Sequence, residues 1–109
     1  MRQCDVALRV RVCSLADVAD NAVRAFAVDG VTWPVIVTRI AGELIACPGV
    51  CPHEDVGLAG GELIGTTLVC PGHGYAFDLT SGRCVHDAAL ELRRYPITVV
   101  GDELYVDLL

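Results

Sequence analysis

The sequence has no long hydrophobic run, although 53% of its 109 residues are hydrophobic and its mean hydropathy is +0.50. Apolar runs such as residues 35–37 are far shorter than the roughly 20 residues that a helix needs to cross a bilayer. We therefore expect no membrane segment. The N-terminal stretch places arginines among valines and leucines, so it also lacks the uncharged apolar centre of a secretory signal. These absences predict a cytoplasmic protein.

Basic residues are few and scattered. The sequence has 8 basic and 14 acidic residues, a formal net charge of −6, and no basic stripe that could follow a phosphate backbone. Nucleic acid is therefore not an expected partner. A small acidic protein would instead be steered toward a basic patch on a protein partner, and salt would weaken the association. The alternative is that the charge only keeps an apolar-rich chain soluble.

The sequence also lacks the Cys-x-x-Cys pair and the helical histidine pair that are typical of structural zinc folds, although it has 6 cysteines and 3 histidines. Two mixed clusters stand in their place. Cys51 and His53 form the first, and Cys70 and His73 form the second, each with a proline after its cysteine. Each cluster offers one soft thiolate and one imidazole. A two-iron, two-sulfide cluster in which two histidines replace two cysteines on one iron fits this donor set better than zinc does.

The two clusters resemble the signature of the Rieske iron–sulfur family, which is Cys-x-His, a spacer of this length, and Cys-x-x-His. The resemblance continues through the aromatic-Asp segment and the Thr-Ser-Gly turn of residues 75–82. It implies one [2Fe-2S] cluster, with Cys51 and Cys70 on one iron and His53 and His73 on the other. In the family the histidine-ligated iron lies nearest the surface, so the two histidines would also be the route by which the electron leaves.

The remaining cysteines are Cys4, Cys13, Cys47 and Cys84. Cys4 and Cys13 lie at the ends of one extended segment that is too long to let them meet. Whether Cys47 and Cys84 approach each other stays open. In a reducing cytosol we expect all four thiols to be free and buried.

Short apolar runs separated by turn residues make up the rest of the chain, without a repeat, a linker or a long helix. Residues 5–12 alternate as a half-buried strand, and Asp29-Gly30 predicts a type I′ hairpin turn between residues 22–28 and 31–40. Pro34 predicts an edge position or a bulge in the second of these strands. Further expected elements are a helical turn near residues 14–17, a turn at 41–42 leading into a strand at 43–46, a strand at 62–69, and hairpins at 75–85 and 92–108.

This pattern predicts an all-β, antiparallel fold in a single domain, which at this length buries roughly two-thirds of the surface of its unfolded chain. The resemblance to the Rieske family implies how the domain is divided. A β-sandwich base is expected from residues 1–46 and 88–109. A smaller cluster-binding β subdomain, residues 47–87, is expected to be inserted into it.

The resemblance implies a soluble one-electron carrier, a Rieske-type ferredoxin that takes electrons from a flavin-dependent reductase and passes them to a terminal oxygenase. No substrate pocket, mononuclear iron site or nucleotide-binding loop is apparent, so we expect an electron-transfer component with no catalytic residue, and a monomer. Val56, Leu58 and Ala59 lie between the two clusters, where they would either form an apolar docking rim or pack inside the lobe. The alternatives are a Rieske-like small subunit of a nitrite reductase, although many of those lack the ligands, and a zinc-stabilised structural module.

Two positions after the second cluster predict a low reduction potential. High-potential relatives carry a serine and a tyrosine there, whose hydroxyls donate toward the cluster sulfurs, and the corresponding residues here are Tyr75 and Phe77. Glu54 and Asp55 add negative charge beside the first cluster. Within the range of roughly −150 to +300 mV for centres with two histidine ligands, we expect a midpoint below zero. His86 has no cysteine partner at the motif spacing and is expected at the surface or packed, outside the ligand set.

Overall fold

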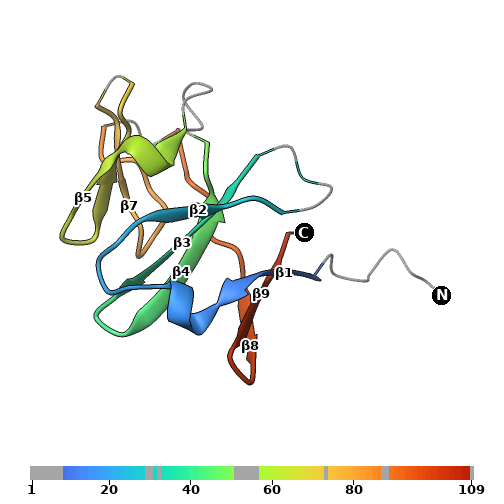
Figure 1. Cartoon of the computed structure of the whole chain (residues 1–109). Coiled ribbons are helices and arrows are strands. Elements are labelled where there is room, and N and C mark those ends of the chain that lie inside the picture. The colour runs from blue at the N-terminus through green and yellow to red at the C-terminus, as the bar shows by residue number, and fades with distance from the viewer. Residues whose placement is uncertain are drawn as a thin grey trace.

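The computed structural model describes residues 9–28, 31, 33–50, 57–72, 74–86 and 89–108. These residues form antiparallel strands in three three-stranded sheets, with two turns of 3-10 helix (Figure 1). The strands are β1 (Arg9–Ser14), β2 (Arg24–Phe26), β3 (Val35–Ile40), β4 (Glu43–Pro48), β5 (Glu62–Ile64), β6 (Thr67–Val69), β7 (Ala76–Asp78), β8 (Ile97–Val100) and β9 (Glu103–Asp107). The predicted all-β fold is confirmed. Within the same residues no helix has both the length and the apolar character needed to span a membrane.

The first sheet joins the two ends of the described chain, because β9 lies between β1 and β8. Arg9 pairs with Asp107 in register, and the two side chains form an ion pair of 2.8 Å. The predicted strand at residues 5–12 is therefore present from Arg9 onward, and residues 5–8 lie outside the described part. The predicted last hairpin is also present, and its turn contains Gly101 at a φ of +60°. At the end of β1, the backbone N–H of Ser14 donates to the Asp17 carboxylate at 3.1 Å, and the predicted helical turn follows at Leu15–Asp17.

The second sheet is β2-β3-β4. The predicted turn at residues 41–42 is present, because Ile40 pairs with Glu43, whereas the connection between β2 and β3 differs from the one expected. Phe26 pairs with Val35, so eight residues separate the two strands and the prediction of a two-residue turn at Asp29-Gly30 is wrong. Asp29 and Gly30 themselves lie outside the described residues. The expectation of an edge position for Pro34 is also wrong, because β3 is the central strand and begins one residue later. The missing N–H of a proline costs no ladder bond when the residue stands before the strand.

The third sheet, β5-β6-β7, contains a hairpin where one strand was expected. Ile64 pairs with Thr67, and Gly65 lies between them at a φ of +61°, a conformation that favours glycine. The prediction of a continuous strand over residues 62–69 is therefore wrong. The predicted hairpin over residues 75–85 is present, with Phe77 opposite Cys84.

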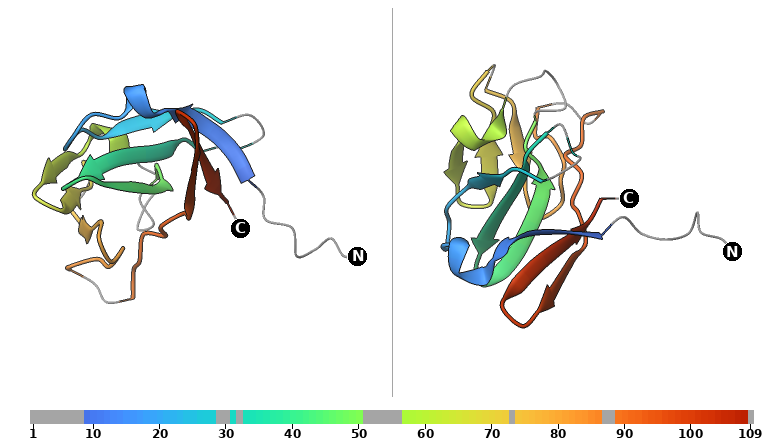
Figure 2. Two further views of the ribbon diagram at one scale, coloured as in Figure 1. Left: turned by 90° about the horizontal axis from the view of Figure 1, so that it is seen from below. Right: turned by 45° about the vertical axis from the view of Figure 1, so that its right-hand side comes forward.

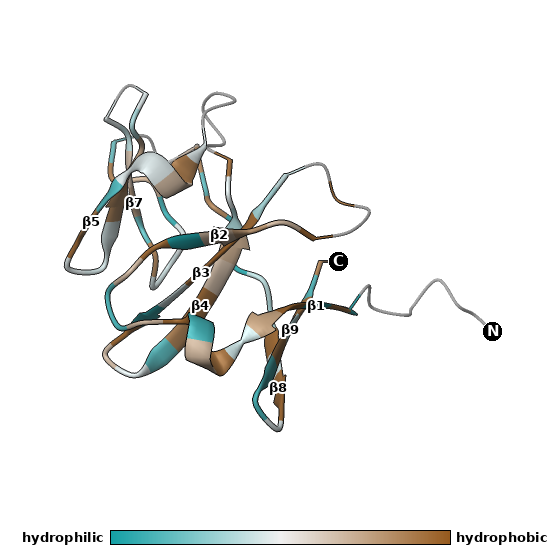
Figure 3. Ribbon diagram, viewed as in Figure 1, coloured by the Kyte–Doolittle hydropathy of each residue, from teal (hydrophilic) through white to brown (hydrophobic). Residues whose placement is uncertain are grey.

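Strand β3 lies between two apolar clusters, which explains why four of its six residues are hydrophobic (Figure 3). Figure 2 shows the sheet that contains β3 between the third sheet and the first. Ile36 and Ile40 belong to the cluster shared with the third sheet, whereas Val35 and Val37 belong to the cluster shared with the first sheet. A strand that is covered on both faces has no need of alternating polar residues. The central strand thus packs the third sheet, which carries the second predicted ligand loop, against the rest of the molecule.

Candidate metal centre

Of the four predicted ligands, Cys70 lies in the described part of the chain, and Cys51, His53 and His73 lie outside it. Cys70 directly follows β6 and is 1% exposed. It belongs to the apolar cluster that also contains Phe77. The ligand set as a whole remains a prediction, and the structure bears on it through the residues that hold the two loops in place.

The second loop is closed at its base by two backbone hydrogen bonds. The N–H of Cys70 donates to the carbonyl of Tyr75 at 2.7 Å, and the N–H of Gly74 donates to the carbonyl of Cys70 at 3.1 Å. Gly74 has a φ of +75°, which a residue with a side chain rarely adopts. The segment that contains His73 therefore begins and ends beside the buried Cys70.

The first loop is closed in the same manner. Val50 and Gly57 form an antiparallel bridge, and the N–H of Leu58 donates to the carbonyl of Gly49 at 2.8 Å. Gly49 is itself fixed, because its N–H donates to the carbonyl of Pro34 at 2.8 Å and a Cβ atom there would lie 2.9 Å from the Pro34 ring. The two ends of the segment that contains Cys51 and His53 are thus held side by side.

The described residues that follow the first loop lie close to those at the start of the second. The 3-10 turn Leu58–Gly60, which sequence reasoning missed, follows the first loop and packs against the strand that leads to the second. A Cβ atom on Gly61 would lie 2.1 Å from the carbonyl oxygen of Val69, and one on Gly60 would lie 3.8 Å from the Pro71 ring. Leu58 is 0% exposed, so it packs inside the lobe, and the alternative of a docking rim is wrong for this residue.

This arrangement fits a cluster that is held by two thiolates and two imidazoles. Each loop is anchored at its base, and Gly60, which follows the first loop, lies close to Pro71 in the second, since a Cβ atom on Gly60 would reach van der Waals distance of the Pro71 ring. Each loop also carries one cysteine and one histidine. Two adjacent, separately anchored loops can therefore present two mixed donor pairs to one iron–sulfur cluster.

His86 is exposed, as predicted, and has a further role that sequence reasoning missed. Its Nδ1 atom accepts a hydrogen bond from the backbone N–H of Ala76 at 3.2 Å, and its ring centroid lies 6.0 Å from that of Tyr75. His86 therefore holds in place Tyr75 and Ala76, the residues at the end of the second loop. The motif spacing gave no signal for this contact, because the contact depends on the pairing of β7 with residues 84–85.

The other described cysteines are structural. Cys13, Cys47 and Cys84 are free and buried, as predicted, so no disulfide joins Cys47 to Cys84. Burial raises the pKa of the Cys47 thiol to about 12, and the nearby Arg94 guanidinium opposes this only partly. Cys4 lies outside the described residues. The buried thiols therefore belong to the core and not to the ligand set.

The sequence profile of the family described as Rieske [2Fe-2S] domain matches residues 9–96. The chain belongs to the Rieske [2Fe-2S] domain family. Its cofactor is accordingly one Rieske-type [2Fe-2S] cluster. The alternative of a zinc-stabilised structural module is therefore rejected. This Rieske chain is 32% identical over 103 residues to the 3-phenylpropionate/cinnamic acid dioxygenase ferredoxin subunit of Escherichia coli (strain K12), with 92% of this chain and 93% of the relative covered.

Other relatives and solved structures agree with this assignment. The chain is 29% identical over 99 residues to the biphenyl 2,3-dioxygenase ferredoxin component of Rhodococcus jostii (strain RHA1), with 90% of this chain and 91% of the relative covered. The ferredoxin of Sphingomonas yanoikuyae B1 superposes with a TM-score of 0.82 at 25% identity, with 93% of this chain and 99% of that chain covered. The two sequence relatives are named as ferredoxin components of dioxygenase systems, which are electron-transfer and not catalytic components, and the Rieske ferredoxin fold is confirmed.

Proposed function

We propose that this Rieske protein carries single electrons from a flavin-dependent reductase to a terminal oxygenase. The [2Fe-2S] cluster supplies the site that gains and loses the electron. The residues of the chain hold that site, with Cys51 and Cys70 as ligands of one iron and His53 and His73 as ligands of the other. The chain itself performs no turnover of an organic substrate.

The observation that carries this proposal is the sequence identity that the chain shares with each kind of relative. The chain is 32% identical to a dioxygenase ferredoxin subunit, with 92% of the chain covered. It also superposes at a TM-score of 0.80 and 26% identity on a chain from a complex of reduced oxygenase and oxidised ferredoxin of carbazole 1,9a-dioxygenase. Its match to the terminal oxygenase of carbazole 1,9a-dioxygenase from Nocardioides aromaticivorans IC177 is a similarity of fold alone, at 22% identity. These identities support the role of the carrier.

We also propose the division into a base of residues 1–46 and 88–109 and a cluster-binding lobe of residues 47–87. The third sheet falls within the lobe, and all strands of the first sheet fall within the base, which supports this division. The cytoplasmic location, the monomeric state and a midpoint potential below zero remain predictions of the sequence.

Anaerobic stopped-flow mixing tests the proposed function. The dithionite-reduced protein is mixed with the oxygenase components of 3-phenylpropionate/cinnamic acid, biphenyl and carbazole dioxygenase systems, and its visible absorption is followed. We expect reoxidation by at least one of them at a rate that depends on the oxygenase concentration. Reoxidation by none of the three would contradict the proposal.

A further inference from the structure

Two valines are the most exposed large apolar side chains in the described part of the chain, Val85 at 63% and Val100 at 61%. They belong to opposite ends of the molecule. Val85 lies on the segment paired with β7, next to the second ligand loop, whereas Val100 ends β8. Figure 1 and the right panel of Figure 2 place the β8–β9 turn at the end opposite the loop between β6 and β7. Equal exposure in two such different places makes Val100 a natural reference for Val85.

The segment of Val85 and His86 is fixed directly to the exit of the second loop. The N–H of Val85 donates to the carbonyl of Ala76 at 2.8 Å, and the N–H of Ala76 donates to Nδ1 of His86 at 3.2 Å. Ala76 follows Tyr75, whose carbonyl accepts the hydrogen bond from Cys70. The carbonyl and the N–H of Ala76 are thus hydrogen-bonded to Val85 and His86, respectively.

The hydrogen bond to Ala76 also fixes the tautomer of His86. A neutral imidazole has one N–H donor and one acceptor nitrogen, so a ring that accepts at Nδ1 carries its proton on Nε2. Nε2 has no partner among the described residues, and the side chain is exposed. His86 therefore offers a donor to an incoming surface, beside the exposed methyl groups of Val85.

We propose that Val85 and His86 form a docking contact for the terminal oxygenase. The inference rests on the proposed function, because an oxygenase that takes the electron from the cluster has to cover the face beside the second loop. The partner surface is apolar opposite Val85 and presents a carbonyl or carboxylate oxygen to Nε2 of His86. Because both residues are already held by Ala76, little conformational entropy is lost on docking.

The first test compares Val85→Asn with Val100→Asn in the complete, cluster-loaded protein. The probe is whichever of the three oxygenase components named above oxidises the reduced wild-type protein fastest, and the second-order rate constant is measured. We expect Val85→Asn to lower it about tenfold, which corresponds to ~1.4 kcal/mol, because a polar amide replaces an apolar anchor. Val100→Asn should stay close to wild type. Both variants should keep the wild-type midpoint potential, since neither substitution adds a charge.

The second test separates the role of the Nε2 donor of His86 from that of the hydrogen bond between its Nδ1 and the Ala76 N–H. In His86→Asn the side-chain oxygen can still accept the Ala76 N–H, but the outward donor is lost. We expect the same visible spectrum and midpoint potential as the wild type, with electron transfer to the oxygenase slowed several-fold and reduction by dithionite unchanged.

Three outcomes would overturn the docking inference while the proposed function stands. Val85→Asn and Val100→Asn could transfer electrons equally fast. Val85→Asn could slow reduction by a reductase and leave transfer to the oxygenase unchanged. Either Val85→Asn or His86→Asn could shift the midpoint potential, which would assign that residue to the support of the cluster. If the wild type reduces none of the oxygenases, the proposed function fails instead.

Discussion

Thr38 is the residue at which the core departs most clearly from its apolar character. Its hydroxyl is fully buried on the central strand β3 and has no hydrogen-bond partner among the residues that the structure describes. A buried hydroxyl without a partner loses its hydration without compensation. We expect Thr38→Val, which keeps the shape of the side chain, to stabilise the protein by about 1 kcal/mol. A rise in the thermal midpoint followed by circular dichroism would confirm this, and a fall would show that the hydroxyl is satisfied.

The reactivity of the buried Cys47 thiol should depend strongly on pH. With a pKa raised to about 12 by burial, only ~10⁻⁴ of the Cys47 side chains are thiolate at pH 8, and the thiolate is the form that reacts. The thiolate fraction rises tenfold for each pH unit up to the pKa, so alkylation of the folded protein should stay negligible at pH 8 and accelerate as the pH rises. Mass spectrometry of iodoacetamide adducts at Cys47 measures this. Rapid labelling at pH 8 in the folded state would show that the site opens readily.

The turn between β3 and β4 shows what a local pattern can and cannot predict. Asp29-Gly30 has the residues that a type I′ turn prefers, yet the chain between β2 and β3 is a longer loop. The two-residue turn with positive φ angles lies at Ala41 and Gly42, at +52° and +83°. Ala41 adopts this strained angle because six successive residue pairs between β3 and β4 fix the register. Tertiary pairing therefore overrides local preference.

This strain at Ala41 predicts a stabilising substitution. We expect Ala41→Gly to raise the free energy of unfolding by about 0.5–1 kcal/mol, because glycine adopts the angle without a steric cost. Ala25→Gly on the exposed strand β2 is the matched control, and it should lower stability. The thermal midpoints of the two variants should move in opposite directions. Equal losses in both would contradict the assignment of strain to Ala41.

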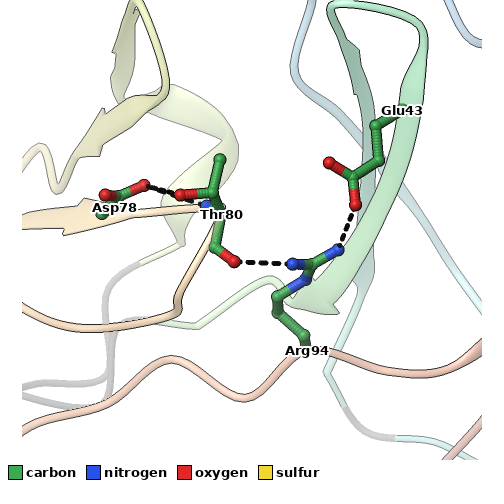
Figure 4. A network of polar contacts seen from close by, with 4 residues as sticks. All are labelled: Glu43, Asp78, Thr80 and Arg94. Carbon is green, nitrogen blue, oxygen red and sulfur yellow. Dashed lines mark hydrogen bonds and ion pairs between the residues drawn. The ribbon is translucent and has the colours of Figure 1, made fainter.

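Arg94 links three elements that are distant in the sequence (Figure 4). Its guanidinium donates to the carbonyl oxygen of Thr80 at 2.7 Å and to the carboxylate of Glu43 at 3.1 Å. Thr80 lies in a turn that is held by Asp78, whose carboxylate accepts from both the N–H and the hydroxyl of Thr80. These bonds lower the pKa of Asp78. The guanidinium thus joins the hairpin after β7 to the start of β4.

Removal of this link should cost more than removal of an ordinary surface ion pair. We expect Arg94→Ala to destabilise the protein by about 1 kcal/mol, and Arg94→Lys to recover little, because a single ammonium group does not reproduce the planar fork. Arg9→Ala breaks the exposed pair with Asp107 and should lower the stability less than Arg94→Ala does, because solvent screens an exposed ion pair. Thermal midpoints rank the three variants. A full recovery by lysine would show that only the charge matters.

At the scale of the whole molecule, the sequence predicted the fold class and the positions of the two loops but not how the loops are held. Cys70 was predicted from its spacing to other ligands, and its place at the end of β6 agrees with a loop ligand. The bracing of Ala76 by His86 and the packing of Gly61 against Val69 were not predictable, because each depends on contacts between segments that are paired only in the folded chain. The spacing of cysteines and histidines in the sequence thus indicates which side chains can bind the cluster. The contacts that hold the loops in place depend on the tertiary structure.

We expect Cys51, His53, Cys70 and His73 to hold one [2Fe-2S] cluster with both histidines on the same iron. Pulsed EPR of the dithionite-reduced protein, labelled with ¹⁵N only in its histidines, tests this most directly. We predict a spin-coupled signal with two strongly coupled histidine nitrogens, loss of normal assembly in Cys70→Ser, and both couplings retained in His86→Ala. A reduced cluster without coupled histidine nitrogens, or the loss of a coupling in His86→Ala, would show that this ligand set is wrong.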